Sequence, residues 1–153
     1  MAVNTTPAFV GVLKDWYTVS GIVTVANTTR DLTSGTIYTF MTAGTNGSRI
    51  DHIEIQPLGT NVATVIRFWI NNGSTTATRE NTQLFCEVSM PSTTATDAAA
   101  LTPTILKAGA GSPSGTPPLP DNGLILTAGY KIYVTTGTTV AAGFHINAFG
   151  GDY

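Results

Sequence analysis

At 153 residues the chain has the length of one ordinary domain, enough to bury about 68–70% of the surface that its unfolded form exposes. Only 10% of the residues are charged, against about 25% in a typical domain, and the net charge is -2. Nucleic acid and anionic membranes are therefore excluded as expected partners, because both require clustered lysine and arginine. So little charge favours an oligomer or a lattice, although a Thr-rich sandwich that is soluble by itself is the alternative.

The first 20 residues mix Pro7 with apolar and aromatic residues without a sustained period. They predict an extended N-terminal arm, residues 1–20, with one short strand near Phe9 to Leu13, followed by a single β-sandwich domain over residues 21–153. An arm of this kind is ordered only when something holds it. No secretory signal and no membrane span is recognisable, so we expect the product to remain at first in the cytoplasm where it is made.

Alternation of apolar and polar residues predicts strands along the next third of the chain. Gly21–Ala26 and Thr36–Met41 predict two short strands with a polar loop between them. The strongest pattern is Arg49–Asn72, where Pro57 and Gly59 separate two long alternating runs. We interpret this stretch as a long antiparallel hairpin that needs a second sheet over its apolar face.

The second half of the chain continues the pattern. Leu84–Met90 and Thr104–Lys107 predict strands, Thr96–Leu101 predicts one helical turn, and Gly109–Pro120 predicts a loop rich in Gly, Pro and Ser. Leu124–Phe149 repeats the hairpin pattern and ends in a strand that we expect to be central. The count of about eight strands predicts an all-β protein, an antiparallel β-sandwich of the jelly-roll type.

Residues that could carry chemistry are few and scattered. His52 and His145 with Asp51 or Glu54 would be the only zinc site to consider, but no His-x-His spacing is present. Cys86 alternates with apolar residues, which indicates a buried, inert thiol. There is no Gly-x-Ser-x-Gly elbow and no phosphate-binding loop. The sequence therefore predicts no enzyme, no cofactor and no metal.

Exposed aromatic residues, arginine and proline point instead to contact with other molecules. The candidate interface residues lie in the arm, in the second run of the hairpin and in the long loop: Trp16, Tyr17, Arg67, Trp69, Pro113, Pro117 and Pro118. The alternative is a stacking platform for sugar rings, built from Trp16, Tyr17, Trp69 and Tyr130 or Tyr133. We favour the protein interface because the surrounding sequence carries so little charge.

Two segments, LGTNVATVIRFWINNG (Leu58–Gly73) and LTAGYKIYVTTGTTVAAGFHINAFGGDY (Leu126–Tyr153), resemble small structural proteins of tailed bacteriophages. The resemblance covers about a third of the chain and rests on Asn-rich turns and the Ala-Gly-Tyr strand entry. It implies a virion protein, a decoration or cement protein on the capsid surface. The implied partners are the major capsid protein and sister copies in a homotrimer.

No functional residue is carried over by this resemblance, because the pattern is structural. We expect the arm and the loop Gly109–Pro120 to make the contacts with the shell or with sister subunits, through several weak contacts engaged together. A tail or fibre component that binds a carbohydrate receptor on the host is the alternative function.

Overall fold

The regular structure of this computed structural model is almost entirely β. The structure describes residues 11–17, 21–107 and 119–153, without the side chain of Tyr17. The elements in this described part are β1 (Val12–Tyr17), β2 (Tyr38–Thr42), β3 (Ser48–Pro57), β4 (Thr64–Asn71), a 3₁₀ helix η1 (Arg79–Asn81), β5 (Thr82–Met90), β6 (Thr104–Lys107), β7 (Leu124–Leu126), β8 (Lys131–Thr136) and β9 (Phe144–Asp152).

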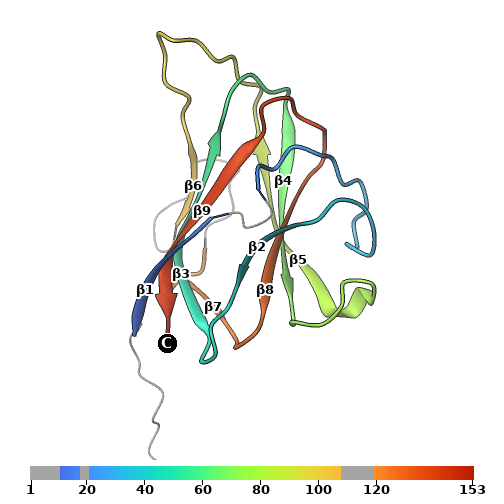
Figure 1. The fold of residues 1–153 in the computed structure, drawn as a ribbon, viewed down its shortest axis with the longest axis vertical. Coiled ribbons are helices and arrows are strands. Elements are labelled where there is room, and N and C mark those ends of the chain that lie inside the picture. The colour runs from blue at the N-terminus through green and yellow to red at the C-terminus, as the bar shows by residue number, and fades with distance from the viewer. Residues whose placement is uncertain (1–10, 18–20, 108–118) are drawn as a thin grey trace, which may run out of the picture.

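The strands form two antiparallel sheets that face each other (Figure 1). Sheet A has the order β1-β9-β3-β6, with β7 also paired to β3, and sheet B has the order β2-β8-β4-β5. Apolar side chains on the facing sides form the core, with Ile53, Ile55 and Ile146 from sheet A and Phe68 and Val134 from sheet B fully buried. The predicted antiparallel β-sandwich is confirmed, as is the central position of the last strand, because β9 lies between β1 and β3.

The pairing of the strands is nested. The first strand pairs with the last, β2 pairs with β8, β3 pairs with β6, and β4 pairs with its neighbour in sequence, β5. The described chain thus behaves as a long two-stranded ribbon that is wrapped so that successive strand pairs lie alternately in sheet A and sheet B. Strand β7 lies outside this nesting.

The hairpin predicted at Arg49–Asn72 is wrong, because β3 lies in sheet A and β4 in sheet B. Each strand has one apolar face, and crossing between the sheets brings those two faces together in the core. Asn61 fixes the crossing: it is 3% exposed, and its side-chain oxygen accepts hydrogen bonds from the backbone nitrogens of Ala142 and Gly143 at 2.9 and 2.8 Å. The hairpin pattern predicted for Leu124–Phe149 is also divided between the sheets, because β7 and β9 lie in sheet A and β8 lies in sheet B.

The N-terminal predictions also need correction. Within the described residues the first strand is Val12–Tyr17, which shares Val12 and Leu13 with the predicted Phe9–Leu13, while residues 9–10 lie outside the described part. It pairs along its whole length with β9, so these residues belong to sheet A. Gly21–Ala26 forms no strand. It makes only two isolated bridges, from Val23 to Phe144 and from Ala26 to Thr136, because it passes from one sheet to the other.

The predicted helical turn at Thr96–Leu101 is absent, and an isolated bridge joins Thr96 to Ala99 instead. Six residues are too few to offset the cost of helix nucleation without packing, and the three alanines are exposed. The strand predicted at Thr104–Lys107 is confirmed with its bounds. Strand β5 contains the predicted Leu84–Met90 and begins two residues earlier, at Thr82.

Candidate functional site

The outer face of sheet B is covered by the protein's own chain. We call Ala26–Thr36 the cover segment, which Figure 1 shows as a blue loop beside sheet B. Ala26 bridges to Thr136 of β8, and the backbone nitrogen of Asn27 donates to the Thr136 oxygen at 2.8 Å. The Asn27 side chain closes the segment on itself by donating to the backbone oxygens of Ser34 and Thr36 at 2.9 and 3.0 Å. Leu32 is fully buried.

Trp69 and Arg67 lie at this covered face, so their predicted exposure is wrong. Trp69 is 1% exposed, and its indole nitrogen donates to Thr135 Oγ1 at 3.0 Å. The Arg67 side chain is 11% exposed; it donates to Glu87 at 2.8 Å and to the backbone oxygen of Asn27 at 3.1 Å. Strand alternation placed both residues on the outer face correctly, but Trp69 is buried there and Arg67 is hydrogen-bonded to the cover segment, whereas Leu84 and Glu87 of the same sheet each remain 36% exposed.

Glu87 links the covered face to the cover segment. It accepts hydrogen bonds from Arg67 of β4 and from Arg30 of the segment. The hydrogen bond from Arg67 holds the pKa of Glu87 below its ordinary value, and the charge of Arg30 adds to the effect. The carboxylate therefore acts as a structural clamp between two cations.

Trp16 was predicted to be an exposed anchor, and this is also wrong. It pairs with Ala148, which is fully buried, and its side chain packs against the core. The side chain of Tyr17 lies outside the described residues. So do Pro113, Pro117 and Pro118, and the interface predicted for these four residues stays a prediction.

The outward side of sheet A, in contrast, is exposed. We call this side, which carries Leu13, His52, Ile105, Ile125 and Phe149, the open face. Leu13 is 87% exposed, Ile125 61% and Ile105 41%. The rings of His52 and Phe149 stack with their centroids 4.3 Å apart and their planes 21° apart. Three strands at the margins of this side of the sheet, β1, β6 and β7, therefore expose apolar side chains to solvent. The central strands β3 and β9 carry the aromatic pair.

The register shows how wide the open face is. Leu13 pairs with Gly151, Gly151 with Arg49, and Arg49 with Ile125, so one row of residues crosses four strands. At about 4.8 Å between neighbouring strands, Leu13 and Ile125 lie about 14 Å apart. The open face is a broad sheet surface and not a cleft.

Both histidines lie on the open face but not together. His52 pairs with Phe149, whereas His145 pairs with Gln56, four residues further along β9. That separation is about 13 Å at the rise of a strand, whereas zinc ligands lie about 2 Å from the metal. No group of three metal-ligating side chains occurs in the described part of the chain. Burial raises the pKa of the Cys86 thiol to about 12, as expected for an inert thiol.

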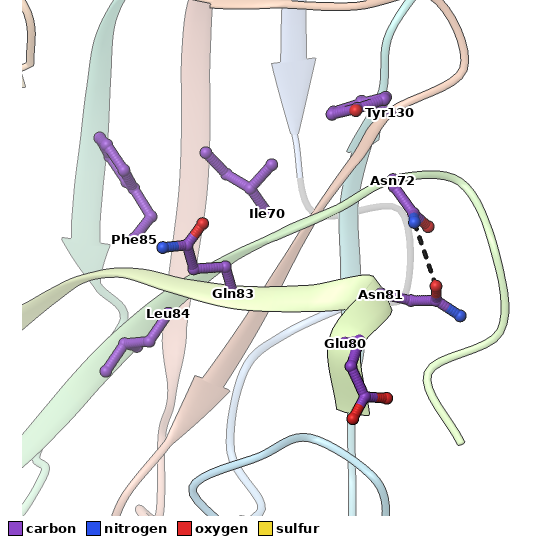
Figure 2. A pocket seen from close by; sticks show the side chains of 8 residues that line it. All are labelled: Ile70, Asn72, Glu80, Asn81, Gln83, Leu84, Phe85 and Tyr130. Atoms are coloured by element: carbon purple, nitrogen blue, oxygen red, sulfur yellow. Dashed lines mark hydrogen bonds between the residues drawn. The ribbon is translucent and has the colours of Figure 1, made fainter. Parts of the chain in front are cut away.

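A pocket of about 450 Å³ opens at one end of sheet B, and we call it the end pocket (Figure 2). It is formed by the end of β4, the β4–β5 connection with η1, the start of β5 and the turn before β8. Its lining residues are Ile70, Asn72, Glu80, Asn81, Gln83, Leu84, Phe85 and Tyr130. The predicted sugar platform contained only Tyr130 of this set.

Comparison with protein-family models, with curated proteins and with solved structures finds no match for this chain. Within residues 11–17, 21–107 and 119–153, no helix is long and apolar enough to cross a membrane. The functional argument therefore rests on the open face and the end pocket.

Proposed function

We propose that this protein is a non-enzymatic structural protein of the virion, a capsid decoration protein that binds the outside of a phage head and stabilises contacts between capsid subunits. The observation that carries the proposal is the open face. The proposed partner of this face is the surface of the major capsid protein. Sister copies in a homotrimer are the second proposed partner.

The composition of the open face favours a protein neighbour. Specific interfaces have an apolar and aromatic centre with charged groups towards the rim. Here Phe149 and His52 stack in the two central strands, while Asp15 on β1 and Lys107 on β6 flank them in the same row, at the two edges of the sheet. A broad sheet surface fits another flat surface better than it fits a small ligand, which needs a concave site.

The nested strand pairing supports the same proposal. Pairing of first with last, second with next to last, and so on is the pattern of a jelly roll once β7 is set aside. We assign the sandwich to that type, which is common among viral capsid domains and also occurs in lectins. The assignment agrees with the resemblance of Leu58–Gly73 and Leu126–Tyr153 to phage structural proteins.

The proposed mechanism is mechanical. A rigid sandwich that bridges neighbouring capsid subunits adds contact area that has to be broken before the shell opens. Several contacts made at once strengthen one another, so each of them can be weak. The arm and the loop Gly109–Pro120 remain predicted contacts in addition to the open face.

The direct test is to add purified protein back to phage heads that lack it and to measure occupancy. Replacing Leu13 and Ile125 by Asp puts charge into the open face, and we expect affinity for the particle to fall at least about tenfold. Val62→Asp is the matched control, because Val62 is 55% exposed in the β3–β4 connection, away from the open face. Full occupancy by the Leu13→Asp/Ile125→Asp protein would overturn the proposal.

The contribution of the arm needs a separate test. A deletion of residues 1–15 would remove most of β1, so the truncation has to end at Val10. We expect the protein lacking residues 1–10 to fold and to bind particles less tightly, whereas the mass of the full-length protein in solution should be near three times 15.9 kDa. Full occupancy by this protein would remove the arm from the mechanism and leave the open face as the contact.

A further inference from the structure

We propose that the end pocket is a binding site for a neutral sugar, with room for one or two rings. This inference does not rest on the role of the open face, because the two regions lie on different sheets. Its volume of about 450 Å³ is within the range of small-molecule sites, about 300–1,000 Å³. Figure 2 shows apolar and polar side chains from three separate parts of the chain around it.

One side of the lining is apolar. Ile70, Phe85 and Tyr130 are all partly buried and pack against the core, so their positions are fixed by the fold. The rings of Phe85 and Tyr130 belong to different strand ends, with Ile70 between them in Figure 2. Aromatic rings and aliphatic groups suit the C–H face of a sugar ring, because the face of an aromatic ring is electron-rich and attracts polarised C–H groups.

A β-bulge places Phe85 in this lining. Phe68 pairs with Cys86 and Trp69 pairs with Leu84, so Phe85 is the extra residue of β5. Its ring is therefore free from the strict alternation of the strand and packs on the core side. Bulges often re-aim one side chain beside a functional site.

The other side of the lining is polar and lacks partners. Among the described residues, the Gln83 amide, the Glu80 carboxylate and the Tyr130 hydroxyl have no hydrogen-bond or ion-pair partner. Together they offer donors and acceptors, which is what a ring with several hydroxyl groups requires. A carboxylate accepts strong hydrogen bonds from such hydroxyls.

Two asparagines are already held in place at the rim. Asn72 Nδ2 donates to Asn81 Oδ1 at 3.0 Å, and Asn72 Oδ1 accepts from the backbone nitrogen of Ser74 at 3.0 Å. Asn81 Nδ2 donates to the backbone oxygen of Thr75 at 2.9 Å. Each amide group keeps one N–H free, so the rim presents fixed donors whose ordering cost has been met by the fold.

The charges of the lining exclude other ligand classes. Glu80 is the one charged residue in it, and no Lys, Arg or His is present. A phosphate, a carboxylate or an acidic sugar would be repelled by Glu80 and would find no cation. A purely apolar ligand would bury the polar groups without partners, which costs about 1–3 kcal/mol for each. A neutral polyhydroxylated ring satisfies both sides of the pocket.

The test uses the full-length ¹⁵N-labelled protein and a panel of neutral sugars, namely glucose, galactose, mannose, N-acetylglucosamine and their disaccharides. We expect at least one of them, at millimolar concentration, to shift the side-chain amide signals of Gln83, Asn72 and Asn81 in a saturable way. No saturable shift at these signals with any sugar, or shifts confined to another surface, would overturn the proposal.

Variants locate the binding. Gln83→Ala and Glu80→Gln each change a solvent-exposed group without a partner and should weaken binding roughly three- to tenfold. Tyr130→Ala should weaken binding further, and the two surface variants keep the test valid if Tyr130→Ala fails to fold. Gln56→Ala on sheet A is the control and should leave sugar binding unchanged. Because the Gln56 amide donates to the backbone oxygens of Pro57 and Leu101 at 3.0 and 3.3 Å, circular dichroism is used to check that this variant folds. Unchanged affinity in both Gln83→Ala and Glu80→Gln would contradict the site.

The two proposals fail separately. The Leu13→Asp/Ile125→Asp protein should lose particle binding and keep sugar binding, whereas Gln83→Ala should do the reverse. If the Leu13→Asp/Ile125→Asp protein lost sugar binding while its circular dichroism spectrum stayed unchanged, the sugar would be bound at the open face and the end pocket would be excluded.

Discussion

The outer faces of the two sheets have the same alternating sequence pattern but differ in their exposure to solvent. On sheet B the cover segment folds back over β4 and β8, so Trp69 and Leu32 are buried and Arg67 is paired. On sheet A, Leu13, Ile105 and Ile125 face solvent. The comparison teaches that one protein can cover apolar residues of one sheet face with its own chain and leave apolar residues of the other face exposed to solvent.

The cover segment has a local cost that its burial offsets. Leu32 has a φ of 58°, a left-handed conformation that costs a branched residue about 1–2 kcal/mol. Full burial of a leucine side chain stabilises by about 1.5–3 kcal/mol, so the conformation is maintained only while Leu32 stays on the sheet. The covered face is therefore part of the fold, and its disruption should be measured as lost stability.

The largest expected effect is that of Trp69→Ala. Removing a fully buried aromatic side chain together with its hydrogen bond to Thr135 should lower the free energy of unfolding by about 3–5 kcal/mol. Urea unfolding followed by circular dichroism measures this. Tyr133→Ala is the control, since Tyr133 pairs with Trp69 across β4 and β8 but is partly exposed, and it should cost about 1 kcal/mol. Equal losses in the two variants would mean that the segment does not seal the face.

Arg67→Met should have the next largest effect. It keeps the apolar stem but removes the hydrogen bonds to Glu87 and to the Asn27 oxygen, so we expect a loss of about 2 kcal/mol in the free energy of unfolding. Arg30→Met removes the other cation from Glu87, but the Arg30 side chain is 60% exposed, and a pair of this kind contributes about 0.5 kcal/mol or less. A larger loss for Arg30→Met than for Arg67→Met would reverse the assigned roles.

The acid limb of stability should depend on both sheets. In sheet B, the hydrogen bond from Arg67 lowers the pKa of Glu87. In sheet A, burial opposes the ionisation of Asp152, but hydrogen bonds from Lys14 and Ser48 outweigh this effect, so the pKa of Asp152 is lowered as well. A carboxyl group whose pKa is lower in the folded state stabilises the fold at pH values above its ordinary pKa, which is 4.5 for Glu87 and 3.8 for Asp152. This stabilisation is lost as the pH falls through the lowered pKa values.

We therefore expect the free energy of unfolding to fall as pH is lowered below about 4.5, and to fall less steeply in Arg67→Met, which frees Glu87. Denaturant titrations over this pH range check the slope. A slope that is identical in the wild type and Arg67→Met would show that the clamp at Glu87 makes no contribution.

The smallest expected effect on stability comes from the open face. Leu13→Asp and Ile125→Asp change exposed side chains and should alter the free energy of unfolding by no more than about 0.5 kcal/mol. The same two changes together should lower the affinity for the particle at least about tenfold, which is the opposite of the pattern at Trp69. A loss of several kcal/mol in either variant would place the residue in the fold and not in an interface.

Strand alternation was enough to predict the sandwich and the burial of Cys86, because a period of two fixes which side chains share a face. It does not fix which strands are neighbours. Both long runs of Arg49–Asn72 were assigned correctly as strands, yet their pairing was wrong, since a connection with Pro57 and Gly59 suits a crossing between sheets as well as a hairpin.

The covered face could not be predicted from β4 alone. The signal was elsewhere: Leu32 is the only apolar residue between Asn27 and Gly35, and a single leucine in a polar loop indicates that the loop lies on something. The open face was missed for a related reason. Leu13, Ile105 and Ile125 each lie next to another apolar residue in their strands, so the outward residue cannot be told from its apolar neighbour by pattern.

The most direct test of the open face is hydroxyl-radical footprinting of the free and the particle-bound protein. We predict that binding protects Leu13, Ile105, Ile125 and Phe149 and leaves Val62 as reactive as in the free protein, while Trp69 is protected in both states by the cover segment. Protection confined to other surfaces, with Leu13 and Ile125 still fully reactive on the particle, would contradict the assignment of sheet A as the face held by a neighbour.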